Sequence, residues 1–401
     1  MSADVLYIDD SDRYSRLRLI GWWDQDKIRA AKVLVVGAGA IGNEVLKNLA
    51  LLGVGRIWVI DLDEIEDSNL TRSVLFRHED CGKSKAIAAA EEVVNINPDV
   101  KITPIHGNVI TDIGLGLFRE VDVVIGALDN REARLWVNRS CWKVGTPWID
   151  GGIQEISGVA KVFVPPDGAC YECAMTENDY RLINLRYSCP LLKREDLMAG
   201  KVPTAPTIAS MIGGLQVQEA LKLIHGLPVD EGQALVWNGQ ANNFYKTAYQ
   251  RKEDCLSHDT YGEPIELPLS AAAATADELF AVAAAHFGIP TRSVSEGSPP
   301  HLTLALDRDL VVSLDCACGN SRRVMQPQQL VGASDAKCPA CGQTAKPRLE
   351  HSIDAGTPLA AEKLSALGIP PYDIVRVGDD QKEAVFVLGG DREAALGPSP
   401  K

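Results

Sequence analysis

The sequence predicts an α/β fold, in which a Rossmann-like domain with a mixed, mostly parallel sheet precedes a smaller C-terminal α+β domain. The first observation is a short apolar run, Lys32–Val36, which turns through six glycine-rich residues into an apparent helix at 43–52. The second is another apolar run, Arg56–Ile60, which ends on Asp61. The third is that further strand-like and helix-like segments follow to about residue 260.

The turn between the first strand and the first helix has the spacing of a nucleotide-binding loop. It contains Gly37, Gly39 and Gly42 in the pattern GxGxxG. Glycines let the backbone approach a phosphate, and the helix N-terminus presents free amides to it. Asp61, at the end of the second strand, suits a ribose hydroxyl. The pattern predicts a nucleotide but does not say which, since a dehydrogenase would look the same up to Asp61.

The residues that carry charge around this loop favour a triphosphate over a dinucleotide. A dinucleotide needs few cations, whereas a triphosphate that releases pyrophosphate needs several cations and a metal. Arg16, Arg72 and Lys85 could supply the cations, and Asp129 could hold the metal. The alternative is that these are solvated surface charges.

The remaining elements follow in order. A helix is expected at 83–97, where alanine and apolar residues recur at helical spacing until Pro98. The strand at 121–127 is apolar except for Asp122, which favours a central place in a parallel sheet. Further strands are expected at 101–105, 147–150, 158–164, 235–237 and 244–248, with a long loop at 165–203 and an apolar helix at 204–224.

Asp129 follows the strand at 121–127 directly. Ligands in open α/β sheets bind beyond the carboxyl ends of the strands, so this position suits a metal ligand. The alternative is that Asp129 caps the next helix by accepting hydrogen bonds from its first amides.

Length, charge and cysteine spacing narrow the class of protein. A chain of 401 residues should form two domains. Its formal net charge of −14 argues against nucleic acid and anionic membrane as partners. No apolar run is long enough to span a bilayer, and no secretion signal is recognisable at the N-terminus. The ten cysteines, mostly in close pairs, indicate metal binding in a reducing cytoplasm rather than disulfides.

Two of these cysteine pairs predict a zinc ribbon at 315–345. Each pair is followed by a glycine, as in a zinc knuckle. The alternative is two unrelated pairs of buried thiols. Cys141 is expected to be a small buried apolar residue, and Cys81 is assigned no chemistry. The ribbon pairs are Cys316 and Cys318 before Gly319, and Cys338 and Cys341 before Gly342.

Several motifs together resemble the ubiquitin-activating enzyme superfamily, which includes the adenylyltransferases of molybdopterin and thiamine biosynthesis. The resemblance covers about residues 10 to 260. The matching segments are RYSR, GAGAIG, DLDEIEDSNLTR, GKSK, LDNREAR and CYEC.

The resemblance implies an adenylation domain at 1–260 that binds ATP, with Asp129 as the magnesium ligand. It also implies a homodimer in which Arg16 reaches the nucleotide of the partner subunit. The alternative for Arg16 is a salt bridge on its own helix. The implied nucleotide-binding residues are Gly37, Gly39, Gly42, Asp61, Asp63, Asn69, Arg72, Lys85, Asp129 and Asn130.

The resemblance further implies a structural zinc site and a catalytic cysteine. The zinc ligands would be Cys170, Cys173, Cys255 and His258, with His258 where the family has a cysteine. The nucleophile would be Cys189, in the loop between the CxxC pair and the following apolar helix. Nearby arginines and lysines would lower the pKa of the Cys189 thiol. The alternative is a structural loop cysteine.

A second domain is expected at 261–392, with the zinc ribbon as an insertion. It should contain helices at 276–286 and 359–367 and strands at 301–306, 310–314, 373–377 and 384–388. This order is compatible with a β-grasp, the ubiquitin-like fold with which activating enzymes recruit a conjugating enzyme. Residues 393–401 are expected to form a disordered tail.

The sequence thus predicts ATP-dependent adenylation of the C-terminal glycine of a ubiquitin-like protein, thioester formation on Cys189 and transfer to a conjugating enzyme. The expected cofactors are ATP, Mg²⁺ and two structural Zn²⁺ ions. One alternative is a sulfur-transfer adenylyltransferase that makes a C-terminal thiocarboxylate. A second is a non-catalytic, nucleotide-binding scaffold subunit, and a nicotinamide dehydrogenase is the most distant.

Overall fold

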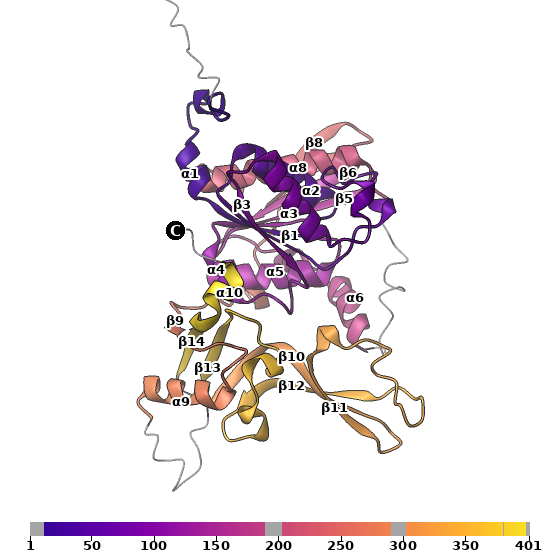
Figure 1. Cartoon of the computed structure of the whole chain (residues 1–401), viewed down its shortest axis with the longest axis vertical. Coiled ribbons are helices and arrows are strands. Elements are labelled where there is room, and N and C mark those ends of the chain that lie inside the picture. Colours follow the sequence, from indigo (N-terminus) through magenta and orange to yellow (C-terminus); the bar gives the residue numbers. More distant parts are fainter. Residues whose placement is uncertain (1–11, 189–202, 290–301, 380, 398–401) are drawn as a thin grey trace, which may run out of the picture.

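The computed structural model describes residues 12–188, 203–289, 302–379 and 381–397, which form two sheets with helices around them (Figure 1). The first sheet has eight strands in the order β3-β2-β1-β4-β5-β6-β7-β8. Its first five strands are parallel and its last three antiparallel, which confirms the Rossmann-like, mostly parallel sheet. The strands are β1 (Lys32–Val36), β2 (Arg56–Asp61), β3 (Lys101–His106), β4 (Val123–Gly126), β5 (Trp148–Gln154), β6 (Ser157–Phe163), β7 (Gln233–Asn238) and β8 (Asn243–Ala248).

Helices cover both faces of this sheet. On one face lie α2 (Ala40–Leu52), α3 (Lys85–Ile96) and α8 (Pro206–His225), with α1 (Gln25–Ala30) beside them; on the other lie α4 (Leu115–Glu120) and α5 (Arg131–Val144) (Figure 1). Val33 and Val35 belong to the core of the first face, and Leu34 and Val36 to that of the second. Because β1 is buried on both faces, its sequence is continuously apolar.

One of the helices that were not expected lies in a predicted loop. The loop predicted at 165–203 contains α6 (Glu177–Ser188). Thr176 and Asp179 begin it, since the backbone amide and hydroxyl of Thr176 both donate to Asp179 Oδ2, at 2.9 and 2.8 Å. This pair, three residues apart, resembles a capping box and was the sequence signal for the helix.

The second sheet has six strands in the order β11-β10-β13-β14-β9, with β12 paired to β10. A helix, α9 (Ala276–Phe287), lies on it and begins with a capping box formed by Thr275 and Glu278. The assignment of this sheet to the β-grasp stays a prediction. The strands are β9 (Ile265–Leu267), β10 (Thr303–Asp315), β11 (Ser321–Pro327), β12 (Lys346–Asp354), β13 (Ile374–Gly378) and β14 (Glu383–Leu388).

Two predictions for this sheet were wrong in detail. The strands expected at 301–306 and 310–314 are parts of the single strand β10, whose pairing shifts register between Ala305 and Leu310. The helix expected at 359–367 is instead two 3₁₀ turns, Pro358–Ala361 and Leu364–Leu367. The helix is broken because the backbone between the turns pairs with the segment before α9: Ala276 N donates to Glu362 O and Leu364 N to Ala274 O.

The C-terminal segment also differs from its prediction. Residues 392–396 form a short helix, α10 (Arg392–Leu396), so the first part of the tail expected to be disordered is helical. The carbonyl oxygen of Leu396 accepts hydrogen bonds from the guanidinium of Arg56 and from Trp58 Nε1 on β2. These contacts order the segment.

The two sheets share a core. Tyr372, Ile374 and Val387 of the C-terminal part pack in the same apolar cluster as Trp58 and Phe118. A boundary near residue 260 stays a prediction; one apolar cluster crosses it, whereas the other large clusters lie on one side of it or the other.

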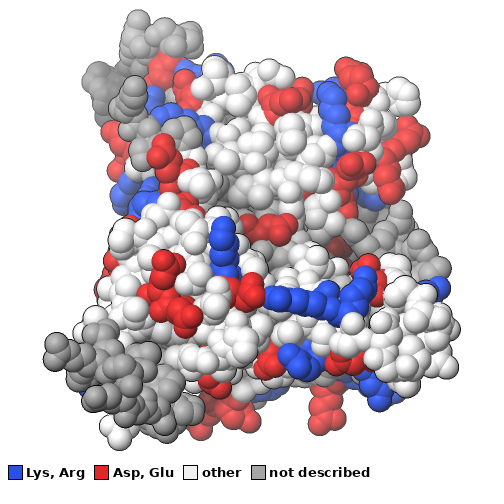
Figure 2. Space-filling view, turned by 60° about the horizontal axis from the view of Figure 1, so that its bottom comes forward, with Lys and Arg blue, Asp and Glu red and all other residues white. Residues whose placement is uncertain are grey.

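The surface carries both signs of charge. On the face shown in Figure 2, a short row of Lys and Arg side chains is bordered by Asp and Glu. No helix among the described residues combines the length and apolar character that crossing a membrane requires.

Candidate nucleotide site and metal centres

The glycine turn lies where β1, β2 and β4 end. The amide of Gly37 donates to Ile60 O at 2.8 Å, and Gly37 has φ +97°. A Cβ on Gly37 would lie 2.4 Å from Ala127 O, and one on Gly42 would lie 2.0 Å from Gly37 O. Neither position has room for a side chain. A Cβ on Gly39 would meet nothing within 4 Å, so space is open above the N-terminus of α2.

Asp61 holds this turn in place. Its Oδ2 accepts from Ala38 N at 2.7 Å, and its Oδ1 accepts from Asp63 N at 2.8 Å. Burial raises the pKa of Asp61, and these backbone donors together with Lys85 oppose the rise. Each carboxylate oxygen has a second lone pair, so Asp61 can also accept the predicted hydrogen bond from a ribose hydroxyl.

Asn43 connects the turn to the loop that carries the predicted cations, and sequence reasoning missed it. Its side-chain amide donates to Ala38 O at 2.7 Å, and its oxygen accepts from Leu75 N at 2.8 Å. Asn43 is fully buried. A polar residue inside a predicted apolar helix was the signal that could have found it, since buried amides need partners.

The predicted phosphate contacts lie on the crossover between β2 and α3. Lys85 begins α3, and its Nζ lies 3.0 Å from Asp63 Oδ2. Arg72 Nη1 donates to Ser68 O at 2.8 Å, and Asn69 Oδ1 accepts from Glu66 N at 3.0 Å. The crossover thus fixes the backbone around these side chains.

The structure separates the roles of Asp129 and Asn130. Asn130 is the N-cap of α5, because its Oδ1 accepts from Ala133 N at 2.8 Å. Asp129 is exposed just beyond β4, which pairs with β1 in parallel. Its carboxylate is therefore not needed as a cap. That leaves it available to a metal ion beside the glycine turn.

Arg16 is not brought together with these residues in the same chain. It lies two residues after Tyr14, whose hydroxyl accepts from Asn97 Nδ2 at 2.8 Å. Asn97 ends α3 just before β3 begins, at the amino ends of the strands, whereas Asp129 lies at their carboxyl ends. Arg16 is exposed, and no intrachain salt bridge is found for it among the described residues.

A buried ion cluster, which the sequence did not reveal, lies beneath Asp129. Asp150 is fully buried; its Oδ1 lies 2.8 Å from Arg134 Nε and its Oδ2 lies 3.0 Å from Lys161 Nζ. Burial alone would raise the pKa of Asp150, but Arg134 and Lys161 outweigh it and lower the pKa. Arg134 also donates to Leu128 O and Gly151 O, so the cluster fixes the loop before Asp129.

This cluster predicts acid lability. A carboxylate whose folded pKa is depressed stabilises the fold above its unfolded pKa of about 4, and this stability is lost as the pH falls towards the folded value. We expect the free energy of unfolding of the wild type to fall more steeply below about pH 4 than that of Asp150→Asn, which has no carboxylate to protonate. Urea unfolding across this range measures both slopes, and equal slopes would contradict the assignment.

The first predicted zinc set converges. Cys170 Sγ lies 3.6 Å from Cys173 Sγ and 3.5 Å from Cys255 Sγ, and Cys173 Sγ lies 3.4 Å from His258 Nε2. All four ligand atoms lie within 4.8 Å of one another. These separations fit tetrahedral zinc with bonds of about 2.0–2.3 Å. Four protein ligands fill such a site, so the ion would be structural.

Buried groups connect this set to α5 and α6. Glu172, between the two cysteines of the CxxC, accepts from Arg139 and from Tyr180 OH at 2.7 Å. It also accepts from Ser257, between the other two ligands. Both ligand turns are thereby held against α5.

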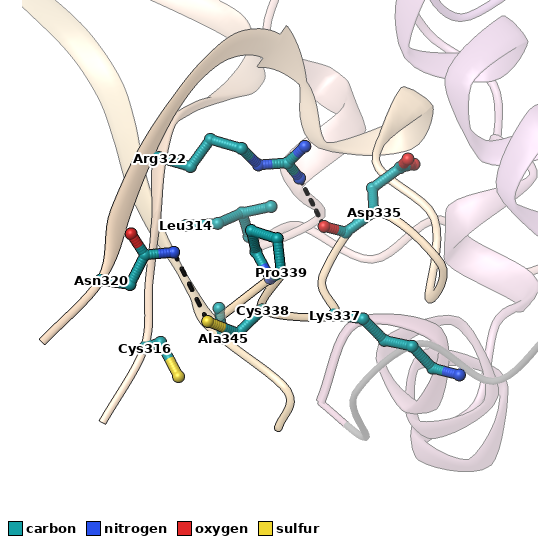
Figure 3. Close-up of a pocket in the computed structure, with 9 residues that line it drawn as sticks. All are labelled: Leu314, Cys316, Asn320, Arg322, Asp335, Lys337, Cys338, Pro339 and Ala345. Carbon is teal, nitrogen blue, oxygen red and sulfur yellow. Dashed lines mark hydrogen bonds between the residues drawn. The ribbon is translucent and has the colours of Figure 1, made fainter. Parts of the chain in front are cut away.

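The second predicted set also converges. Cys316 Sγ lies 3.5 Å from Cys341 Sγ, and Cys318 Sγ lies 3.7 Å from Cys338 Sγ. The glycines after the pairs, Gly319 and Gly342, have φ +85° and +73°, as a knuckle requires. Figure 3 shows this region, where Asn320 donates to Cys338 Sγ at 3.5 Å. The arrangement fits a second tetrahedral zinc.

Two further cysteines were assigned from the sequence. Cys141 is fully buried, and burial raises the pKa of its thiol well above the usual value, so it is an apolar core residue as expected. Cys189 lies outside the described residues, and its predicted role as nucleophile stays a prediction.

Comparison with known proteins places this site in a family. The ThiF family matches residues 11–257. SUMO-activating enzyme subunit 2 of Dictyostelium discoideum is 45% identical over 41% of this chain, but the match covers only 25% of that protein. Ubiquitin-like modifier-activating enzyme 5 of the same organism is 32% identical, with 64% of this chain and 68% of that protein covered.

Two further similar proteins are not named as activating enzymes of ubiquitin-like modifiers. Sulfur carrier protein adenylyltransferase of Thermus thermophilus is 30% identical, with 62% of this chain and 90% of that protein covered. A crystal structure of E. coli MccB with ATP has a TM-score of 0.51 and 27% identity, over 62% of this chain and 74% of the other. With the family matching more than half of the chain, the resemblance inferred from the motifs is confirmed, and the chain belongs to the ThiF family.

Proposed function

We propose that this protein adenylates the C-terminal glycine of a ubiquitin-like protein. The observation that carries the proposal is the meeting of three features at the carboxyl ends of β1, β2 and β4: the glycine turn, the Lys85–Asp63 pair and the exposed carboxylate of Asp129. A dinucleotide site would not need the last two. The name of the relative ubiquitin-like modifier-activating enzyme 5 supports the choice of substrate.

In the proposed reaction, the C-terminal carboxylate of the substrate protein attacks the α-phosphorus of ATP. A bond forms between the carboxylate oxygen and phosphorus, and the bond to the leaving pyrophosphate breaks. Arg72 and Lys85 offset the charge that develops on pyrophosphate, together with Arg16 of the partner subunit in a homodimer. Asp129 would hold Mg²⁺, which supplies further positive charge at the phosphates.

We propose that Cys189 then takes the acyl group. Its thiolate attacks the acyl carbon, a carbon–sulfur bond forms, and AMP leaves with the oxygen of the mixed anhydride. The thioester passes to a conjugating enzyme, for which the C-terminal sheet is the proposed docking unit.

A thioester assay tests this step. Wild type incubated with ATP, Mg²⁺ and a candidate ubiquitin-like protein ending in glycine is expected to form a thiol-sensitive adduct, visible on electrophoresis without reductant. Cys189→Ala should form none and should keep ATP–pyrophosphate exchange, because the adenylate forms before the thiol acts. An adduct of equal yield in Cys189→Ala would exclude this cysteine as the nucleophile.

A second function, sulfur transfer, is favoured by the match that spans 90% of the sulfur carrier protein adenylyltransferase. The adenylate would be the same, but sulfide-level sulfur from a donor would attack the acyl carbon, so that a carbon–sulfur bond forms, AMP leaves and a thiocarboxylate results. Pyrophosphate exchange without any protein-bound thioester would favour this function.

A further inference from the structure

A third group of potential metal ligands lies outside the two predicted zinc sets. Asp67, His78 and Cys81 each offer one ligand atom, and these atoms lie within 4.8 Å of one another. His78 Nδ1 is 3.3 Å from Asp67 Oδ1. The thiol of Cys81 is exposed and free. Among the described residues, this group and the two zinc sets are the groups in which three or more potential ligand atoms of Cys, His, Asp or Glu lie this close together.

The turn that carries His78 and Cys81 resembles the turn that carries Cys255 and His258 in the first zinc set. His78–Asp80 form a 3₁₀ turn, and Cys81 N donates to His78 O at 3.2 Å. In the first zinc set, Leu256–His258 form a 3₁₀ turn after Cys255, and His258 N donates to Cys255 O at 3.1 Å. In both turns, one thiol and one imidazole stand three residues apart at the two ends of a closed turn.

The ligand side chains of the cluster are accessible to an ion, and the neighbouring carboxylate of Asp80 is paired with other groups. Asp80, between the two ligands of the turn, is already committed, since its carboxylate accepts from Arg77 N at 2.8 Å and from Lys83 Nζ at 2.9 Å. The side chains of His78 and Asp67 are 86% and 81% exposed, so an ion can reach them without rearrangement of the core.

We propose that Asp67, His78 and Cys81 form a third cation site, which binds a zinc-class divalent ion and leaves one coordination position open. Imidazole, thiolate and carboxylate together favour zinc over magnesium or calcium, which prefer oxygen ligands. Three protein ligands leave the fourth tetrahedral position to water or an added ligand. With three protein ligands instead of four, the site binds the ion more weakly than the two zinc sets.

The site would join two segments that flank the nucleotide site. Asp67 begins the 3₁₀ turn that ends at Asn69, and Cys81 lies four residues before Lys85. The segments are already adjacent, because Gly82 N donates to Ile65 O and Ile65 N to Lys83 O, both at 2.9 Å. A bound ion would fix their separation and so restrict the crossover that carries the phosphate contacts.

Metal content measured on the full chain tests the site. Wild type, Cys81→Ala and His78→Ala are dialysed against the same zinc buffer at micromolar free zinc, and bound zinc per chain is measured. Both variants are expected to hold about one zinc fewer than wild type, because each loses one of three ligands. The difference does not depend on how many ions the rest of the protein binds. His351→Ala is the matched control, since His351 Nδ1 lies 2.6 Å from Asp309 Oδ1 but no cysteine completes that pair.

Cobalt gives a second readout of the thiol. Wild type is first treated with a mild chelator that empties the weaker third site and leaves zinc in the two four-ligand sets. Co²⁺ added to this protein should produce a thiolate-to-cobalt charge-transfer band that Cys81→Ala lacks and His351→Ala keeps. Equal zinc content in wild type and Cys81→Ala, or an unchanged cobalt band in that variant, would overturn the proposal. All the substituted side chains are exposed, so loss of folding does not confuse the comparison.

Discussion

Replacing Asp129 by asparagine is expected to abolish the tightening of ATP binding by Mg²⁺ and to slow adenylate formation by on the order of 10²–10³-fold, the usual cost of one preorganised charge-stabilising group. The amide keeps the size of the side chain but loses the negative charge that attracts the ion. Because Asn130 rather than Asp129 caps α5, the helix should be unaffected. Calorimetric titration with ATP, with and without Mg²⁺, measures the first effect, and pyrophosphate exchange measures the second.

Asp122→Asn provides the control for this substitution. Asp122 is exposed at the other end of the same strand, where its Oδ2 accepts from Lys32 N at 2.7 Å, an acceptor role that asparagine can keep. The Asp122→Asn variant should bind ATP and Mg²⁺ as the wild type does. If Asp129→Asn kept a magnesium effect of normal size, the ion would have to bind elsewhere.

Cys173→Ala is expected to have the largest effect on stability. Structural zinc sites contribute about 10 kcal/mol or more of apparent binding free energy, which is comparable with the whole stability of about 5–15 kcal/mol of a typical domain. Without Cys173 the remaining ligands close only part of the coordination sphere, and His258 loses its sulfur neighbour at 3.4 Å. Thermal unfolding should occur at a much lower temperature, and the purified variant should contain less zinc.

Cys141→Ala separates the loss of a metal ligand from the loss of a buried sulfur atom. Cys141 is fully buried on α5, and no other ligand surrounds it among the described residues. Its substitution should cost about 1 kcal/mol, as an ordinary core truncation does. Equal destabilisation by Cys141→Ala and Cys173→Ala would show that packing rather than zinc accounts for the effect.

Local patterns determined what the sequence could predict. The strand–glycine–helix unit from Lys32 to Leu52 was predicted because each part has its own local pattern. A strand buried on both faces is continuously apolar, a crowded turn contains glycines, and the helix that follows is rich in apolar residues. The two zinc sets were predicted because knuckle spacing is local, although Cys170 and Cys255 meet across 85 positions. The family resemblance indicated that the pair Cys170 and Cys173 shares one ion with the pair Cys255 and His258.

Long-range pairing decided what the sequence could not predict. Arg134, Asp150 and Lys161 looked like ordinary charges, because no local pattern shows that β5 and β6 bring them together in the interior. The segment 359–367 has helical composition, but backbone pairing with the residues before α9 interrupts it. In the same way, α10 is ordered by contacts with Arg56 and Trp58, more than 330 positions away in sequence.

The core shared by the two sheets has a consequence during translation. Trp58 lies on β2, yet Leu396, 338 positions later, covers it, and Tyr372, Ile374 and Val387 pack against the same face. At about 5–20 residues per second, a ribosome needs roughly 20 to 70 s to make the chain between these positions. Part of the first sheet therefore waits, apolar and uncovered, until the last strands emerge. We therefore expect chains that end before these residues to expose this apolar face and to aggregate more readily than the full chain.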